Sequence, residues 1–353
     1  MVGRHRGEVR QRDLGTSATP TTTAATPPTS LAATPLTTSA IGLGCMGLSQ
    51  GYGPADDDES IRVIHRALDL GVRMLDTAIS YGRGHNEQLI GRALAGRHED
   101  VAVATKFGIV RGDDGVRLDA RPEHVRGYCE SSLRRLDAEA IDLYYLHRVD
   151  PEVPVAETIG AMAELVAEGK VRHLGVSEVT VAQLDQAAAT HPITAVQFEW
   201  SLLWRESEAD IVPAARRLGI GLVPYSPLGR GLLTATLDAA TVDRSDFRRT
   251  DARFHDEALN DNLRQVAALR DLATKLGVTS GQLALAWLLA QGPDVVPIPG
   301  TRNRGRLSEN VAAADLELSP AHLDRLDAAL APGTWSGDRT SFAVPVTTRR
   351  SVS

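Results

Sequence analysis

The chain has 353 residues, 42% of them hydrophobic, and a formal net charge of −7. A chain of this length has room for one large α/β barrel or for two smaller domains. The acidic balance argues against a nucleic-acid partner, because binding phosphates needs a basic surface. The cysteines, Cys45 and Cys129, predict neither a disulfide framework nor a zinc site, and no histidine spacing predicts a metal ion. No apolar run is long enough to span a membrane, so we expect a cytoplasmic protein without a membrane partner.

The two ends of the chain differ in composition from its centre. Residues 1–36 are rich in Thr, Ala and Pro and nearly lack large apolar side chains. Such a segment cannot bury enough surface to offset the entropy lost on ordering, which predicts a disordered tail. It lacks the continuous apolar core of a secretory signal, whereas its composition leaves a transit peptide open. We expect one folded domain over residues 37–335, followed by a C-terminal tail over residues 336–353.

From residue 39 onward, short apolar runs alternate with longer amphipathic ones. Pro122 is a good first-turn residue and begins one predicted helix, and further helices are predicted over 155–168, 259–276 and 280–290. A long loop is predicted over residues 228–258, a length that is typical of functional loops. The predicted strands cover residues 40–43, 74–76, 101–106, 141–147, 171–177, 195–199, 221–225 and 295–297. Eight strand–helix units in a row predict a closed (β/α)₈ TIM barrel of the α/β class, with an open doubly wound sheet as the alternative.

Three glycines after the first predicted strand, Gly42, Gly44 and Gly47, match the G-x-G-x-x-G pattern of dinucleotide-binding sheets. That motif requires a helix to open at the glycines. Here Gly51, Gly53 and further loop residues follow, and the first helix is predicted near residue 57. We therefore interpret the glycines as positions where the first barrel loop approaches a substrate or cofactor closely.

Polar residues end most of the predicted strands. In a (β/α)₈ barrel the carboxyl ends of the strands converge on one face, and that face holds the active site. We therefore expect six chemically different side chains to meet at one mouth: Asp76, Lys106, His147, Ser177, Gln197 and Tyr225.

Four residues at this mouth predict the reduction of a carbonyl group. A carbonyl that accepts a hydride develops negative charge on oxygen and needs a proton donor. Tyr81 can supply the proton, and a buried Lys106 beside it favours the phenolate and so makes the phenol a better acid. Asp76 can pair with Lys106 and keep it charged, and His147 can donate a hydrogen bond to the substrate oxygen.

At these residues the sequence resembles the aldo-keto reductases, over about residues 39–315. The resemblance is closest to the bacterial and plant-type members with short barrel loops. The segments that carry it are IGLGCMG (41–47), LDTAISYG (75–82), ATKFG (104–108), SLRRLDAEAIDLYYLHRVDP (132–151), GKVRHLGVSE (169–178), PYSPLGRGLL (224–233) and IPGTRNRGRLSEN (298–310).

The resemblance implies a catalytic tetrad of Asp76, Tyr81, Lys106 and His147, and a site for NADPH. Within that site it implies that Ser177 and Gln197 hold the carboxamide and that Tyr225 stacks on the nicotinamide ring. The residues implied along the pyrophosphate are Ser226, Leu228 and Gly229. Those implied at the 2′-phosphate are Thr301, Arg302 and Arg306, and those at the adenine are Glu309 and Asn310.

The 2′-phosphate site also follows from the residues themselves. Arg302 and Arg306 lie just after the last predicted strand, where barrels commonly bind phosphate. Residues 303–310 are predicted to begin a helix, whose N-terminus favours an anion, and arginine forks suit a phosphate. These features predict NADPH rather than NADH.

The chain departs from the family pattern at three places. Glu178 stands where most members have Asn, and this weakens the expected carboxamide contact there. Only residues 36–39 are left to form the hairpin that usually covers the barrel floor. From residue 333 on, the sequence of the C-terminal tail differs from that of the family.

The predicted function is the NADPH-dependent reduction of small aldehydes or ketones to alcohols, as a monomer or a homo-oligomer. One alternative is a non-catalytic, NADPH-binding redox sensor similar to the β-subunits of potassium channels. Another is a (β/α)₈ lyase or isomerase without a nicotinamide cofactor.

Overall fold

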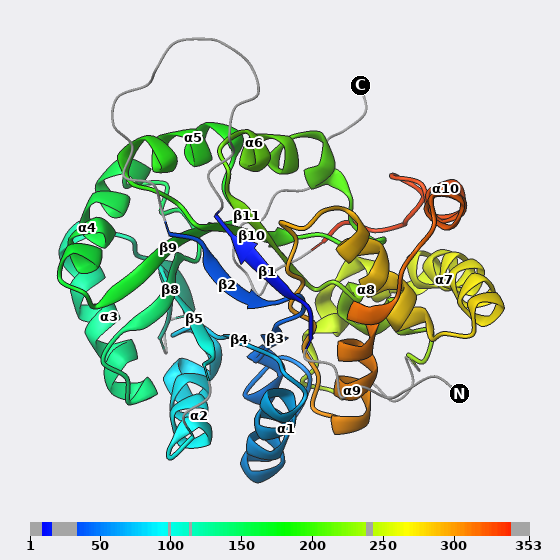
Figure 1. Cartoon of the computed structure of the whole chain (residues 1–353), viewed down its shortest axis with the longest axis horizontal. Coiled ribbons are helices and arrows are strands. Elements are labelled where there is room, and N and C mark those ends of the chain that lie inside the picture. The colour runs from blue at the N-terminus through cyan, green and yellow to red at the C-terminus, as the bar shows by residue number, and fades with distance from the viewer. Residues whose placement is uncertain (1–8, 16–33, 98–99, 113–114, 238–242, 340–353) are drawn as a thin grey trace.

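A computed structural model of the protein describes residues 9–15, 34–97, 100–112, 115–237 and 243–339. Its centre is a sheet of seven parallel strands in the order β11-β10-β9-β8-β5-β4-β3. Helices surround this sheet as a ring (Figure 1). The strands are β3 (Leu43–Gly44), β4 (Met74–Asp76), β5 (Ala102–Phe107), β8 (Ile141–Leu146), β9 (Val171–Ser177), β10 (Ala195–Glu199) and β11 (Gly221–Tyr225).

The segment 295–300 closes the sheet into a barrel. On one side Val296 N and Ile298 N donate to Leu222 O (2.8 Å) and Pro224 O (3.1 Å) of β11. On the other side Gly42 N donates to Pro297 O at 3.0 Å, and Gly44 N, in β3, donates to Pro299 O at 3.3 Å. The segment forms one bridge, Leu222 with Val295, rather than a full strand, because its prolines have no N–H to donate. The predicted TIM barrel is confirmed, and the open-sheet alternative is wrong.

The first-strand glycines serve this closure. A Cβ on Gly44 would lie 2.7 Å from Ile298 O, and a Cβ on Gly300 would lie 2.8 Å from Gly44 O. A short 3₁₀ turn follows β3, and the first α-helix, α1, begins only at Asp57. The glycines therefore let the first and last barrel segments pack backbone to backbone, and the chain does not form a dinucleotide-binding motif here.

The helices begin and end at residues that suit helix termini. Asp56 accepts from Glu59 N before α1, Pro122 begins α3, and Thr180 and Thr279 form capping boxes before α5 and α8. The helices are α1 (Asp57–Asp69), α2 (His85–Leu94), α3 (Pro122–Leu136), α4 (Val155–Ala167), α5 (Val181–Thr190), α6 (Ile211–Arg217), α7 (Asp256–Leu276), α8 (Ser280–Ala290), α9 (Arg304–Ala312) and α10 (Pro320–Ala329).

An N-terminal hairpin lies across the centre of the barrel in Figure 1, inside the ring of helices. Its strands, β1 (Gln11–Leu14) and β2 (Leu36–Ser39), pair antiparallel. Leu14 is fully buried and packs against Gly221, and Arg12 donates to Leu289 O (2.9 Å) and Gly292 O (2.6 Å) at the end of α8. The expectation of a disordered tail over residues 1–36 is therefore wrong for residues 9–15 and for Leu36, which begins β2 and pairs with Leu14. Residues 1–8 and 16–33 lie outside the described part of the chain.

Two further segments differ from the predicted pattern. A hairpin of β6 (Ile109–Gly112) and β7 (Gly115–Leu118) follows β5 and was not predicted, because its strands are only four residues long and mostly half-buried or exposed. Within residues 228–258, the described parts form three 3₁₀ helices, η4 (Gly229–Thr234), η6 (Phe247–Thr250) and η7 (Ala252–Phe254). The predicted long loop is thus an ordered series of short turns over its described part.

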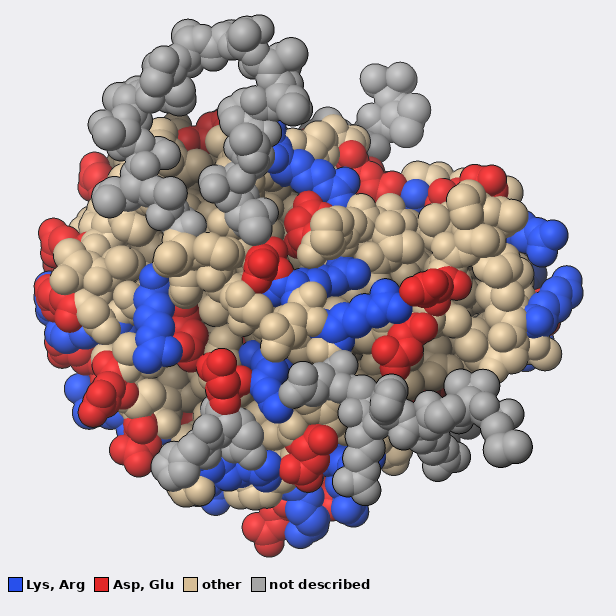
Figure 2. Space-filling model, in the orientation of Figure 1, with Lys and Arg blue, Asp and Glu red and all other residues tan. Residues whose placement is uncertain are grey.

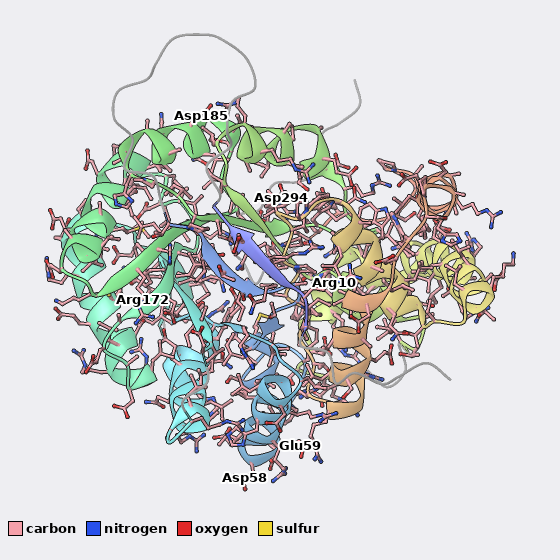
Figure 3. All side chains as sticks on the ribbon, in the orientation of Figure 1. Arg10, Asp58, Glu59, Arg172, Asp185 and Asp294 are labelled. Atoms are coloured by element: carbon pink, nitrogen blue, oxygen red, sulfur yellow. The ribbon has the colours of Figure 1, made fainter. Side chains whose placement is uncertain are left out.

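Charges of both signs are interspersed over the described residues of the face in Figure 2. In Figure 3, Asp58 and Glu59 lie on α1 and Asp185 on α5 at the periphery, whereas Arg10 and Asp294 lie near the hairpin. Within the described ranges, no helix is long and apolar enough to cross a membrane. Those ranges also contain no cluster of His, Cys, Asp and Glu that would hold a metal ion.

Candidate active site

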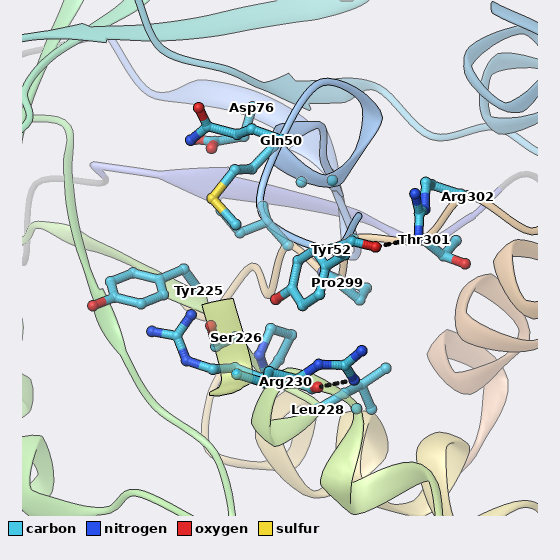
Figure 4. A pocket seen from close by; sticks show the side chains of 18 of the residues that line it. Gln50, Tyr52, Asp76, Tyr225, Ser226, Leu228, Arg230, Pro299, Thr301 and Arg302 are labelled. Carbon is cyan, nitrogen blue, oxygen red and sulfur yellow. Dashed lines mark hydrogen bonds between the residues drawn. The ribbon is translucent and has the colours of Figure 1, made fainter. Parts of the chain in front are cut away.

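A pocket of about 820 Å³ opens at the carboxyl ends of the barrel strands. Asp76, Ser177 and Tyr225, which end their strands, line it together with Gln197 from the middle of β10. In Figure 4, Asp76 and Tyr225 lie toward one side of the cavity, and Arg302 lies on the other side. The volume falls within the range of about 300–1,000 Å³ that is usual for small-molecule and cofactor sites.

Asp76 lines the pocket and forms an ion pair with Lys106, which lies behind it and does not line the pocket. Lys106 is completely buried, and its Nζ donates to Asp76 Oδ1 at 2.5 Å and to Thr77 O at 2.7 Å. Gln197 Nε2 donates to the other carboxylate oxygen of Asp76 at 2.7 Å. Burial opposes the charged form of Lys106, but the attraction of Asp76 and Tyr81 outweighs it and raises the lysine pKa. Lys106 is therefore a fixed positive charge in a low-dielectric site.

Tyr81 lies above this pair, at the start of the 3₁₀ turn Tyr81–Gly84 that follows β4. The Lys106 Nζ is 5.2 Å from the centroid of its ring. Burial raises the pKa of the Tyr81 phenol, and the Lys106 charge offsets part of that increase. Lys106 lowers the Tyr81 pKa, as expected, but burial raises this pKa by more. The phenol therefore stays protonated near neutral pH.

His147 completes the cluster. Its ring meets the Tyr81 ring edge to face, with centroids 5.9 Å apart, and the residue lines the pocket. Burial and the charges of Arg148, Lys106 and Arg111 hold the His147 pKa well below its ordinary value. The imidazole is thus neutral, and its buried Nδ1 has no hydrogen-bond partner among the described residues. A neutral imidazole donates one hydrogen bond, which suits a polar ligand atom in the pocket.

The structure places nearly all the other predicted site residues at the same pocket. Gly229 does not line it; with φ = 55° it packs behind the wall against Leu203. The predicted residues that do line it are Ser177, Gln197, Tyr225, Ser226, Leu228, Thr301, Arg302, Arg306, Glu309 and Asn310.

The two arginines after the closing segment differ in their surroundings. Arg302 donates to the backbone oxygens of Tyr52 (2.7 Å) and Pro54 (2.5 Å), so its guanidinium ties the first loop to the last (Figure 4). The exposed Arg306 is in the first turn of α9, whose N-cap Asn303 accepts from Arg306 N. The predicted helix start after residue 303 is confirmed.

Glu178 does not line the pocket, and it lies behind Tyr225. The Tyr225 hydroxyl donates to Glu178 Oε1 at 2.9 Å, and Arg339 forms a two-pronged ion pair with the same carboxylate. The expectation that Glu178 weakens the carboxamide contact stays a prediction.

Several lining residues were not predicted as site residues, among them Gln50, Arg111, Arg148 and Arg230. Arg230 follows directly after the predicted Leu228 and Gly229 in the segment 224–233, so its position in the sequence could have identified it as a site residue. Arg111 was missed because it lies on the unpredicted β6–β7 hairpin. Among the aromatic residues that follow strand ends, Tyr52 lines the pocket, whereas Phe107, Trp200 and Trp204 are buried and do not.

Comparison with known proteins agrees with this barrel and this pocket. The sequence model of the Aldo/keto reductase family matches residues 40–331. The chain therefore belongs to the aldo/keto reductase family and is an oxidoreductase of that family.

Its similarity to individual members is substantial. It is 45% identical over 304 residues to "Probable aldo-keto reductase 1" of Glycine max, covering 85% of this chain and 88% of that protein. Its structure resembles a glycerol dehydrogenase from Gluconobacter oxydans with a TM-score of 0.77 and 33% identity, over 85% of this chain and 94% of the other. It also resembles an aldo-keto reductase from Klebsiella pneumoniae, solved in complex with NADPH, with a TM-score of 0.64 and 28% identity, over 84% and 92% of the two chains.

Proposed function

We propose that this protein reduces aldehydes or ketones to alcohols with NADPH and that Tyr81 is the general acid. The observation that carries the proposal is that Tyr81, His147 and Asp76 line one pocket, with the buried Lys106 paired to Asp76 directly behind the wall. A protonated phenol held beside a buried cation is an acid arranged to protonate a developing oxyanion.

The residues of the pocket fit NADPH. The pocket has a volume of about 820 Å³ and reaches from Asp76, beside Lys106, to the first turn of α9. There Arg306 and backbone N–H groups favour an anion. Tyr225 and Ser177 would hold the nicotinamide end. Gln197 already donates to Asp76, so its side-chain oxygen is the atom left for a carboxamide N–H. The NADPH complex of the Klebsiella pneumoniae relative supports the same choice of cofactor.

Each polar residue then has one task. When bound, NADPH supplies the hydride that reduces the carbonyl carbon. Tyr81 gives its hydroxyl proton to the carbonyl oxygen, and Lys106 stabilises the phenolate that remains. His147, which is neutral, donates a hydrogen bond that orients the carbonyl oxygen, and Asp76 holds Lys106 in place. Asp76, Lys106 and His147 are buried and Tyr81 is partly buried, so little water reaches these groups and their electrostatic interactions are strengthened.

The proposal is tested by NADPH oxidation with a panel of aldehydes and ketones, for the wild type and for Tyr81→Phe. Replacing the hydroxyl removes only the proton donor, so we expect kcat to fall by about 10²–10⁴-fold while NADPH still binds. Tyr128→Phe is the matched control, because the Tyr128 hydroxyl donates to Asp119 and does not line the pocket. Near-normal turnover by Tyr81→Phe, or a wild type that consumes no NADPH with any carbonyl, contradicts the proposal.

A further inference from the structure

The C-terminal segment reaches the barrel mouth through one side chain. Arg339 is 161 residues from Glu178 in the sequence, yet its Nη2 lies 2.7 Å from Glu178 Oε2 and its Nη1 lies 3.0 Å from Glu178 Oε1. The Arg339 side chain is 4% exposed and the Glu178 side chain 2%, so this is a buried fork-to-fork ion pair. Such pairs fix geometry, because two parallel hydrogen bonds define the plane of both groups.

The same guanidinium connects three neighbouring strand ends. Glu178 directly follows β9, Glu199 ends β10 and Tyr225 ends β11. Arg339 Nη1 is 3.3 Å from the Tyr225 hydroxyl and 3.7 Å from Glu199 Oε2, and the guanidinium lies 5.0 Å from the Trp204 ring centroid. Arg339 thus holds the ends of β9, β10 and β11 together behind the pocket wall, and we call this arrangement the Arg339 clamp.

Tyr225 is the part of this arrangement that lines the pocket, whereas Glu178 and Arg339 do not line it. In Figure 4 the Tyr225 ring stands at the pocket edge with its hydroxyl turned away from Tyr52 and Pro299. That hydroxyl donates to Glu178 Oε1 at 2.9 Å. The orientation of the ring is therefore set by the carboxylate, and the orientation of the carboxylate is set by Arg339.

We propose that Arg339 is a positioning residue for the nicotinamide half of the cofactor site, acting through Glu178 on the ring of Tyr225. The inference rests on the proposed function, which gives Tyr225 the nicotinamide as its ligand. Arg339 is then needed for cofactor binding, although its side chain contacts neither the cofactor nor the substrate.

The test compares two ligands that share the adenine half of NADPH. NADPH reports on the whole site, and adenosine 2′,5′-bisphosphate reports only on the half that lacks the nicotinamide. For Arg339→Met we expect the Kd of NADPH to rise about tenfold, because the Tyr225 ring is no longer held in place for the nicotinamide. The Kd of adenosine 2′,5′-bisphosphate should stay within about twofold of the wild-type value.

Arg205→Met is the matched control. Arg205 also forms a fork with a carboxylate, Glu208, and lies 4.8 Å from a tryptophan ring centroid, that of Trp287, but it does not line the pocket. Neither Kd should change in this variant. Because Arg339→Met leaves a buried carboxylate without its main partner, the double variant Glu178→Gln/Arg339→Met is measured as well, and it should show the same selective loss of NADPH binding.

A double-mutant cycle tests the route through the ring. Tyr225→Phe keeps the ring and removes the hydroxyl that links it to Glu178. If Arg339 acts through this link, Tyr225→Phe and Arg339→Met each weaken NADPH binding, and together they weaken it no more than the larger single effect. The inference would be overturned if the effects of Tyr225→Phe and Arg339→Met on NADPH binding were additive. It would also be overturned if the Arg339 variants lost both ligands in parallel, or if both of them bound NADPH as the wild type does. A wild type that binds adenosine 2′,5′-bisphosphate but not NADPH, or neither, would instead overturn the proposed function and this inference with it.

Discussion

At the scale of single residues, the site depends on one buried cation. Lys106 is one of only three lysines in a chain that otherwise uses arginine for positive charge. A lysine suits the position because its compact ammonium reaches Asp76 and Thr77 at once beneath the Tyr81 ring. A planar guanidinium is larger and has a different hydrogen-bond geometry.

Lys106→Met should lower kcat sharply, and Lys106→Arg should not restore it to about a tenth of the wild-type rate. In the proposed mechanism the reduction needs Tyr81 protonated, so the rate should fall as the pH rises through the Tyr81 pKa. Lys106 lowers that pKa, so its removal should move the alkaline limb of the pH–rate profile to higher pH. Lys170→Met is the control, because Lys170 pairs with Glu130 and Glu168 on the surface of the barrel. An unchanged alkaline limb would show that Lys106 does not act on Tyr81.

We expect the choice between NADPH and NADH to depend on Arg306 more than on Arg302. Arg302 already donates to backbone oxygens of the first loop, whereas Arg306 lines the pocket at the start of α9. Arg306→Ala should weaken NADPH binding about 10–100-fold and NADH binding little, as for one lost charge-assisted hydrogen bond to a phosphate.

Isothermal titration with both cofactors measures this selectivity. Arg302→Ala should weaken the two cofactors alike, because it releases the first loop rather than a phosphate contact. Arg304→Ala is the control, since Arg304 lies on the same helix but pairs with Glu59. Equal affinity of the wild type for NADPH and NADH would refute the assignment without any variant.

At the scale of elements, the N-terminal hairpin is the clearest departure from expectation. Composition predicted disorder over residues 1–36, yet β1 pairs with β2 and buries Leu14 against the start of β11. A four-residue strand in a polar segment has too few apolar residues for a periodic pattern. Its stability comes from the barrel floor that it covers, which local composition does not report.

Leu14→Ala should therefore lower the free energy of unfolding by about 2–5 kcal/mol, the usual cost of a large-to-small change in a core. Turnover at low temperature should be unchanged, because the hairpin does not line the pocket. Urea denaturation measures the effect, with Thr37→Ala, an exposed site on the paired strand, as the control. A loss of less than about 0.5 kcal/mol would mean that the hairpin is not part of the cooperative fold.

At the scale of the whole molecule, the barrel is held closed where its first and last segments meet. Gly42 and Gly44 at one side and Gly300 at the other allow backbone contact that any side chain would obstruct. The proline-rich segment 295–300 supplies acceptors to β3 and donors to β11, so a broken eighth strand still completes the ring. The pocket spans this seam, because Gly44, Ile298 and Gly300 all line it.

Gly44→Ala should therefore destabilise the whole barrel, by about 1–3 kcal/mol if the backbones shift apart. The added Cβ would lie 2.7 Å from Ile298 O, a backbone atom that cannot rotate away. Gly127→Ala is the control, because Gly127 lies in α3 with nothing within 4 Å of an added Cβ. It should stabilise the protein by about 0.5–1 kcal/mol. Both values come from urea denaturation, and equal effects would show that the closure is not tight.

The sequence by itself determined the barrel and the identity of the residues at its mouth. Strand and helix periods are local, and the carboxyl ends of parallel strands must share a face, so the sequence pattern is enough to bring Asp76, Lys106, His147 and Tyr225 together. The tertiary structure alone decided the contacts between distant segments: the hairpin on the barrel floor, the Arg302 tie between the first and last loops, and the Arg339 clamp on Glu178. These contacts join residues far apart in the chain: Arg302 and Tyr52 are 250 positions apart, and Arg12 of the hairpin and Gly292 are 280 positions apart. Nothing in the neighbourhood of either partner signals them, because their stability arises only when the barrel brings both ends to one place.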